Sequence, residues 1–331
     1  MPGRLETARP GNASASRGVY LLSHPRSASN LFQTMMAKQP GHQSSGYKVF
    51  DAGFASLLRL DKGRLSERPE EEREALYNAF RDGFDKLQDE LEDARKNGNR
   101  VFIKEHAMFL SGPDKFFAHV YNDNGVEPLV VYERGAPESA HTSPTSMSDS
   151  LLLSLTPIFQ VRNPILMFPS MLRAENKAMG PIRPRQLVIA ATFTLRHSRD
   201  LYDWYSNHEN ATRPQVIDAD DIMNNKAAVR HVCVETGMDP DAVQYEWETR
   251  KEADPLKAVF LSTINASKSV IPSLAARGLD FETEKKKWKA EFGDEDGEDL
   301  AKFVHDAMPD YNYLLSRRTY LGQVDGQVSL E

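Results

Sequence analysis

One stretch near the N-terminus constrains the fold more than any other part of the sequence. A short apolar run at residues 19–22 is typical of a buried strand, and it stops at Pro25, since proline cannot donate a hydrogen bond to a sheet ladder. A polar turn follows, and residues 31–38 then predict the start of a helix. The turn contains Arg26, Ser27, Ser29 and Asn30. A strand, a polar turn and a helix N-terminus together favour an anion site, because the first N–H groups of a helix lack partners within it.

Length and composition narrow the class of protein. The chain has 331 residues, which is enough for one large α/β domain. Its apolar content of 40% and charged content of 27% are ordinary for a soluble globular protein, and no apolar run approaches the roughly 20 residues of a membrane span. The net charge of -7 argues against a general nucleic-acid binder. The single cysteine, Cys233, excludes an internal disulfide and a cysteine-based zinc cluster, so we expect a cytoplasmic protein without a metal.

Runs typical of strands alternate with runs typical of helices along the chain. The expected strands lie at residues 19–22, 100–106, 129–132, 157–164 and 215–218. The expected helices lie at 66–97, 185–205 and 225–237, and the last third of the chain is expected to be helical. This alternation predicts an α/β fold, with a mostly parallel sheet and helices on both of its faces. We expect a disordered tail over residues 1–17, a surface loop over 39–53 and a single domain over 18–331.

Cationic and titratable side chains follow three of the expected strands. Arg26 follows the first strand, Lys104 and His106 end the second, and Arg162 ends the fourth. Ligands of an open parallel sheet bind beyond the carboxyl ends of its strands, so these groups are expected at one edge of the sheet. Lys104 and His106 are two residues apart and therefore share a face of their strand. The sequence predicts an anion pocket with a candidate base, His106, beside it.

Three segments resemble motifs of the PAPS-dependent sulfotransferases. Residues 24–30 resemble the phosphosulfate loop, Y-P-[KR]-S-G-T-T, at its proline, its basic residue and its first serine. Lys104 and His106 match a K-T-H segment of that family. Arg162 begins an R-[NDH]-P segment, and Ser170 lies eight residues after it, as a serine does in the family.

The sequence also departs from the family pattern. Ala28 stands where the family has glycine, Leu31 stands where it usually has tryptophan, and Glu105 replaces the threonine of K-T-H. A change from glycine to alanine matters where the backbone needs a positive φ. The C-terminal cofactor segment R-K-G-x-x-G-x-W-K has no clear counterpart. The overall pattern resembles the divergent sulfotransferase-like proteins of secondary metabolism.

The resemblance implies a P-loop sulfotransferase-like fold and transfer of a sulfuryl group from PAPS to a hydroxyl or amine of a small-molecule acceptor. The residues that it implies for the 5′-phosphosulfate are Arg26, Ser27, Ala28, Ser29 and Asn30. It implies that Arg162 and Ser170 bind the 3′-phosphate, a role that suits the planar guanidinium fork. In the family pattern, His106 takes the proton of the acceptor, while Lys104 and Arg26 offset charge on the leaving oxygen.

Two other interpretations stay open on the sequence. In one, the same fold has lost PAPS and carries out acid/base chemistry, such as cyclisation or elimination, on a natural product. In the other, the chain is a non-catalytic nucleotide-binding protein. The sequence predicts neither a nucleic-acid nor a membrane partner, and it leaves room for a homodimer.

Overall fold

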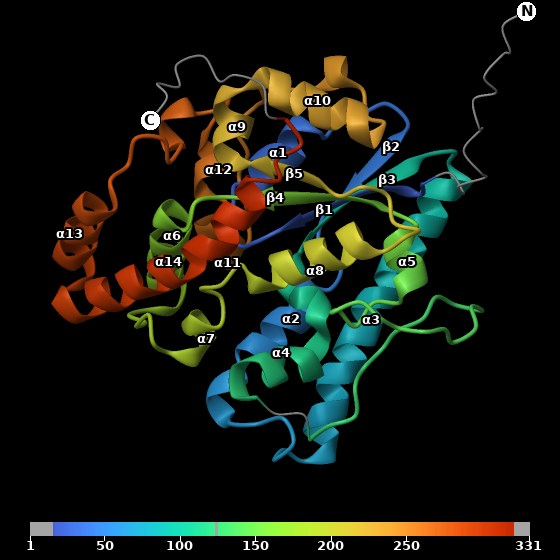
Figure 1. The fold of residues 1–331 in the computed structure, drawn as a ribbon, viewed down its shortest axis with the longest axis horizontal. Helices are drawn as coiled ribbons and strands as arrows, with labels where there is room; N and C mark the ends of the chain where they lie inside the picture. The colour runs from blue at the N-terminus through green and yellow to red at the C-terminus, as the bar shows by residue number, and fades with distance from the viewer. Residues whose placement is uncertain (1–15, 123–124, 321–331) are drawn as a thin grey trace, which may run out of the picture.

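The computed structural model describes residues 16–122 and 125–320, and Figure 1 shows a central sheet with helices on both sides of it. Five parallel strands form this sheet in the order β2-β3-β1-β4-β5. The strands are β1 Gly18–Ser23, β2 His42–Ser45, β3 Arg100–His106, β4 Thr156–Val161 and β5 Gln215–Asp218. Because β1 is central and pairs with β3 and β4, the segments that follow these three strands leave from the same edge.

Helices cover both faces, which confirms the predicted α/β class. The α-helices of the described chain are α1 Ser29–Met35, α2 Phe50–Leu57, α3 Glu70–Lys96, α4 Gly112–Tyr121, α5 Asp149–Leu153, α6 Pro164–Met179, α7 Leu187–Ala190, α8 Arg196–Asn207, α9 Ala219–Asn224, α10 Lys226–Thr236, α11 Pro255–Phe260, α12 Ser262–Ala266, α13 Phe281–Phe292 and α14 Asp294–Leu315. Short 3-10 helices occupy Leu60–Lys62, Ala107–Ser111, Pro240–Ala242 and Pro272–Leu274. The expected helical last third is confirmed by α11 to α14.

The two-residue period of the strands divides the core between the two faces of the sheet. Val19 and Leu21 of β1 belong to a buried cluster that includes residues of α1, α9 and α10. Tyr20 and Leu22 belong to a larger cluster with residues of α2, α3, α6, α8 and α14. Figure 1 shows α9 and α10 on one side of the sheet and α8 and α14 on the other.

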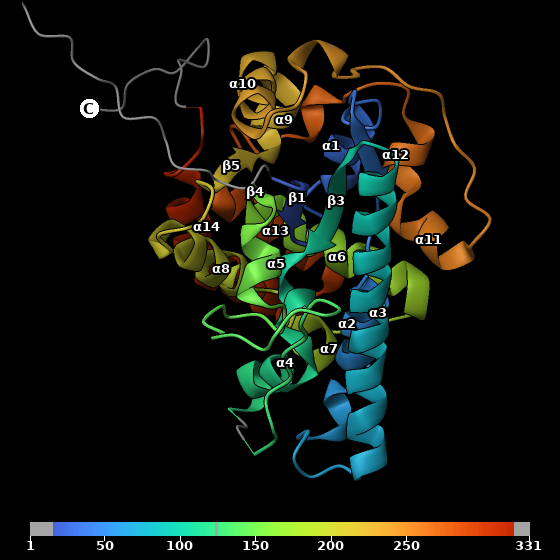
Figure 2. The same ribbon diagram turned by 90° about the vertical axis from the view of Figure 1, so that its right-hand side faces the viewer.

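The long helix expected over residues 66–97 is confirmed as α3, which Figure 2 shows beside β3. It begins at Glu70, directly after Pro69, whose lack of an N–H suits a helix start. Its buried apolar stripe includes Phe80, Phe84 and Leu87, at the three- and four-residue spacing of a helix. Its acidic residues lie mostly on the exposed face.

One strand prediction is wrong, and one strand was missed. Residues 129–132 form only an isolated bridge, in which Val131 pairs with Met147, although Leu129 and Val131 are buried. An apolar run packs into a core without joining a sheet when its backbone bonds are made elsewhere, here with residues 146–148. The missed strand is β2, within the expected surface loop 39–53. It is a short polar edge strand, so its sequence lacks the apolar run that announces a buried strand.

The helix expected over residues 185–205 is broken in two. Residues 191–195 separate α7 from α8, and the break exposes backbone carbonyls to other partners. The carbonyl oxygen of Thr192 lies 2.7 Å from His24 Nε2, at the end of β1. The segment between the two helices therefore packs against the end of β1, where the predicted site residues lie.

The predicted tail over residues 1–17 falls almost wholly outside the described residues. Within the described chain, Arg17 donates a backbone hydrogen bond to Ser154 at 2.8 Å and forms an ion pair with Glu133. No helix among the described residues has the length and apolar character needed to cross a membrane.

Candidate active site

The turn after β1 adopts an unusual backbone. Arg26 and Ala28 have φ values of 66° and 67°, in the left-handed region where glycine is at ease. Ala28 is also the residue at which the resemblance expects glycine. The backbone keeps a positive φ at this position although the residue is alanine. Since α1 has only seven residues, we assign the recognition of an anion to the side chains around the turn rather than to the helix dipole.

Replacing Ala28 with glycine is expected to stabilise the protein. A Cβ in the left-handed region costs roughly 1–2 kcal/mol, and the larger unfolded-state entropy of glycine offsets part of that gain, which leaves about 1 kcal/mol for Ala28→Gly. The measurement is the urea midpoint of unfolding. The control is Ala75→Gly, at an exposed position inside α3, which is expected to lose about 1 kcal/mol. Equal losses in both variants would contradict the strain assigned to this turn.

Side chains from β4 and α6 hold the turn in place. Gln160 Nε2 donates to the backbone oxygen of Ser27 at 2.6 Å, and Arg162 Nη1 donates to the backbone oxygen of Arg26 at 2.9 Å. Arg26 Nε donates to Ser170 Oγ at 3.1 Å. Arg162 and Ser170 are thus brought to the same place, but they are linked through Arg26 instead of contacting each other.

Arg26, Lys104 and Arg162 are three cations at one edge of the sheet, and burial lowers the pKa of each, that of Lys104 to about 7. Their hydrogen-bond acceptors are neutral: a serine hydroxyl, the side-chain oxygen of Asn30 and backbone carbonyls. Within the described chain, none of the three forms a salt bridge with a carboxylate. Glu175 of α6 is buried nearby, and that burial raises its pKa to about 7, which weakens its charge as a partner for Arg26. Lys104 is buried and the two arginines are partly buried, and such charges are normally paired in proteins, so this cluster favours an anionic ligand.

His106 lies beside Ser23, because the two residues are register partners at the ends of β3 and β1. Its Nδ1 is 3.0 Å from Ser23 Oγ, and that hydroxyl donates its own hydrogen to the backbone oxygen of Glu105 at 3.1 Å. Ser23 therefore accepts a hydrogen bond from Nδ1–H, which leaves the lone pair on Nε2 of a neutral ring. Burial, followed by the charges of Lys104 and His24, lowers the pKa of His106 well below its usual value. The ring is neutral near pH 7 and its Nε2 is able to accept a proton.

Two side chains that contact this site were not predicted from the sequence. The hydroxyl of Tyr47 lies 2.9 Å from His106 Nε2, in the loop between β2 and α2. Glu105, the residue that replaces the threonine of the family pattern, holds this loop: its Oε1 accepts hydrogen bonds from the backbone N–H groups of Lys48 and, at 3.0 Å, Val49. The change to glutamate was visible in the sequence, but its partner loop lies more than fifty residues away along the chain.

A C-terminal segment lies against the same site. Arg26 Nη1 donates to the backbone oxygen of Phe260 at 2.6 Å, and Arg162 Nη2 donates to that of Leu274 at 2.9 Å. These acceptors belong to the end of α11 and to the 3-10 helix Pro272–Leu274, neither of which has a buried residue. This part of the chain reaches the site although it lacks the family's R-K-G-x-x-G-x-W-K segment.

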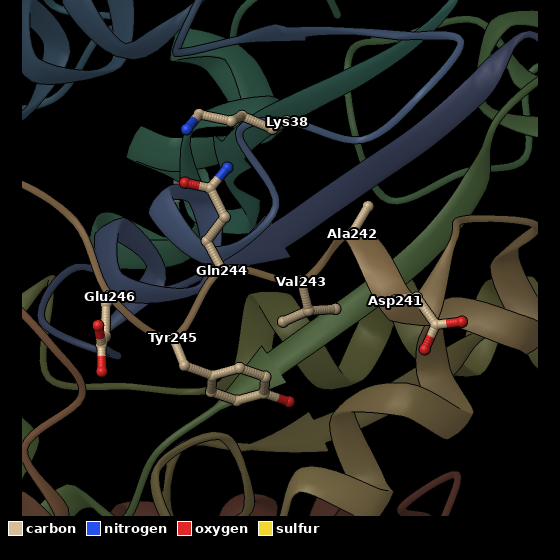
Figure 3. A pocket seen from close by; sticks show the side chains of 7 residues that line it. All are labelled: Lys38, Asp241, Ala242, Val243, Gln244, Tyr245 and Glu246. Atoms are coloured by element: carbon tan, nitrogen blue, oxygen red, sulfur yellow. The ribbon is translucent and has the colours of Figure 1, made fainter.

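A separate groove of about 590 Å³ is lined by Lys38 and residues 241–246. Figure 3 shows the side chain of Gln244 extending toward Lys38, while the side chains of Tyr245 and Glu246 extend away from it. None of the predicted site residues lines it. The groove is therefore distinct from the cation cluster.

Comparison with known proteins decides the family. The chain is 31% identical to the sulfotransferase ppzF of Metarhizium majus, over 90% of this chain and 96% of that protein. It is 30% identical to the ppzF sulfotransferase of Metarhizium rileyi, over 94% of this chain and 98% of that protein. The chain belongs to the sulfotransferase family. The predicted family, and sulfotransferase activity with it, are thus confirmed.

Two further comparisons accompany this result. No family model matches the sequence. The solved structure of a sulfotransferase domain from the curacin biosynthetic pathway is similar at a TM-score of 0.43 and 14% identity, over 82% of this chain and 96% of that domain. That similarity is too low to carry an argument, so the assignment to the sulfotransferases depends on the two Metarhizium relatives.

Proposed function

We propose that this sulfotransferase transfers the sulfuryl group of PAPS to a hydroxyl or amine of a small-molecule acceptor in cytoplasmic secondary metabolism. The observation that carries the proposal is the cluster of three cations around the turn after β1, of which Lys104 is buried and the two arginines are partly buried, and whose acceptors are all neutral. PAPS carries an anionic phosphosulfate and a separate 3′-phosphate, and such a cluster stabilises negative charge.

The residues present fit such a donor. Among the described residues, Ser27 Oγ and Arg162 Nε are buried and have no hydrogen-bond partner, which fits groups that bind a ligand. We propose that the 5′-phosphosulfate is held by the side chains of Arg26, Ser27, Ser29 and Asn30 and by the backbone at Ala28. Arg162 and Ser170 are proposed to bind the 3′-phosphate, and no metal is needed because the cations offset the charge. When bound, PAPS supplies an activated sulfuryl group with a phosphate leaving group.

The proposed mechanism uses the groups already described. His106 accepts the proton of the acceptor on Nε2, while Ser23 holds the opposite nitrogen of the ring. Lys104 and Arg26 offset the negative charge that builds on the leaving oxygen. Burial makes these interactions stronger than they would be in water.

Binding of PAP, the product nucleotide, tests the donor. At about 100 times its dissociation constant, PAP is expected to add roughly 2.7 kcal/mol to the free energy of unfolding, and the melting temperature rises accordingly. Arg162→Ala is expected to remove most of this rise, measured against the variant's own ligand-free melting temperature. The matched control is Arg173→Ala. Arg173 lies on α6, the helix that carries Ser170, and pairs with Glu291 at the surface, so this variant should keep the rise.

A melting temperature that does not change with millimolar PAP or PAPS would refute PAPS as the donor. A PAPS-dependent assay over phenols, alcohols and amines then identifies the acceptor. Consumption of a natural product without PAPS would instead support the acid/base alternative.

A further inference from the structure

The phenol of Tyr47 forms a hydrogen bond with His106 Nε2, the atom that takes the proton of the acceptor in the proposed mechanism. Its hydroxyl lies 2.9 Å from His106 Nε2, and the rings are 4.7 Å apart between centroids. Nδ1 of the histidine donates to Ser23, so Nε2 carries the lone pair and the Tyr47 hydroxyl is the donor of this bond. A nitrogen with one lone pair accepts one such hydrogen bond. Tyr47 and an acceptor hydroxyl therefore compete for the same position.

The groups proposed to assist transfer also surround Tyr47. Lys104 Nζ lies 4.4 Å from the centroid of its ring, and the charge of Arg26 is close enough to affect its ionisation. Ser29, at the start of α1, also lies near the Tyr47 side chain. The tyrosine hydroxyl thus contacts the base and lies near the loop proposed to hold the phosphosulfate.

The position of Tyr47 is held firmly by its neighbours. Phe50 packs on its ring at 5.0 Å between centroids, and Phe109 packs on Phe50 at 5.3 Å. The two backbone N–H groups that follow Tyr47 bind Glu105. Burial raises the pKa of Tyr47, so the phenol keeps its proton until a base removes it.

We propose that Tyr47 is an internal acceptor, which the protein sulfates on Oη when PAPS is bound and no other acceptor is present. In this step, a bond forms between Tyr47 Oη and sulfur, and the bond from sulfur to the 5′-phosphate oxygen of PAPS breaks. The phenolic proton passes to His106 Nε2, and PAP leaves with the electron pair of the broken bond. The product is a tyrosine sulfate beside Lys104 and Arg26, whose charges stabilise it. This inference rests on the proposed use of PAPS.

The test uses the full chain and radiolabelled PAPS, without any added acceptor. Peptide mapping with mass spectrometry in negative-ion mode is expected to find one added SO₃ group on the peptide that contains Tyr47, and excess PAP should suppress it. Tyr47→Phe keeps the ring and removes the hydroxyl, so the label should disappear. His106→Ala should slow the labelling by about 10²–10⁴-fold, the usual effect of losing a positioned base. Tyr132, whose hydroxyl donates to the backbone oxygen of Ser139, serves as an internal control and should stay unlabelled.

The PAP-dependent melting temperature, measured on the same sample, separates the two proposals. A clear rise with PAP but no label on Tyr47 overturns the internal acceptor and leaves the proposed function standing. Label spread over several tyrosines, or label on Tyr47 that is unaffected by His106→Ala, also overturns it. If the melting temperature does not rise and no label is found, PAPS is refuted as the donor, and the internal acceptor is refuted with it.

Discussion

His106→Ala is expected to slow PAPS-dependent sulfonation of a small-molecule acceptor by about 10²–10⁴-fold, the usual contribution of a positioned general base. The physical reason is the tautomer that the structure holds. The Ser23 hydroxyl accepts a hydrogen bond from Nδ1–H and donates one to the backbone oxygen of Glu105, so Nε2 remains the proton acceptor of the ring. Alanine removes that acceptor without touching the cations around the turn after β1.

Binding of the nucleotide separates loss of the base from loss of the fold. The melting temperature of His106→Ala should rise with PAP nearly as much as that of the wild type, because the imidazole is proposed to face the acceptor. His231→Ala is the matched control, since His231 lies at the surface near Glu235 and should leave turnover unchanged. Near wild-type turnover in His106→Ala would show that another group takes the proton.

Lys104→Met is expected to lower kcat by about 10²–10³-fold, the range found when one group that stabilises transition-state charge is removed. Methionine has a similar length and no charge, so it suits a side chain that is 1% exposed. The KM for the acceptor should change little, because the interaction with the leaving oxygen grows only as transfer proceeds. A higher KM with an unchanged kcat would instead make Lys104 a binding residue.

The pH profile gives a second test of Lys104. Burial lowers its pKa to about 7, and only the protonated amine offsets negative charge, so kcat/KM should fall as the pH rises above about 7. Bound PAPS favours the charged amine, so the corresponding fall in kcat should lie at a higher pH. The acidic fall belongs to His106, whose lowered pKa keeps it neutral down to a pH well below the usual histidine range. Lys104→Met should lose the alkaline fall and keep the acidic one; an unaltered profile would contradict this assignment.

Local sequence patterns identified the central strands correctly. Residues 19–22 and 100–106 match β1 and β3, and the expected strand 157–164 overlaps β4, because a buried parallel strand needs apolar side chains on both faces. Residues 129–132 have the same pattern and are not a strand, while β2 is a strand without it. Apolar character reports burial, whereas membership of a sheet depends on which backbone groups find partners, and those partners are distant in the sequence.

The backbone of the loop shows a similar division. The sequence raised the question whether Ala28 needs a positive φ, and only the structure answers it, with a φ of 67°. No propensity favours alanine in that region, so the turn is held by tertiary contacts such as that from Gln160. The motif spacing also paired Arg162 with Ser170, whereas in the folded chain both contact Arg26.

The sequence by itself determined the edge of the sheet at which chemistry is expected, because parallel strands bring their carboxyl ends together and Arg26, His106 and Arg162 follow three of them. Only the tertiary structure placed Tyr47 on His106, through a loop that Glu105 holds from its buried side. No periodicity marks a single tyrosine in a polar loop, and its role depends on a hydrogen bond across fifty-nine residues of chain. A strand end is a local property that composition reveals, whereas the partner of one lone pair is decided by packing alone.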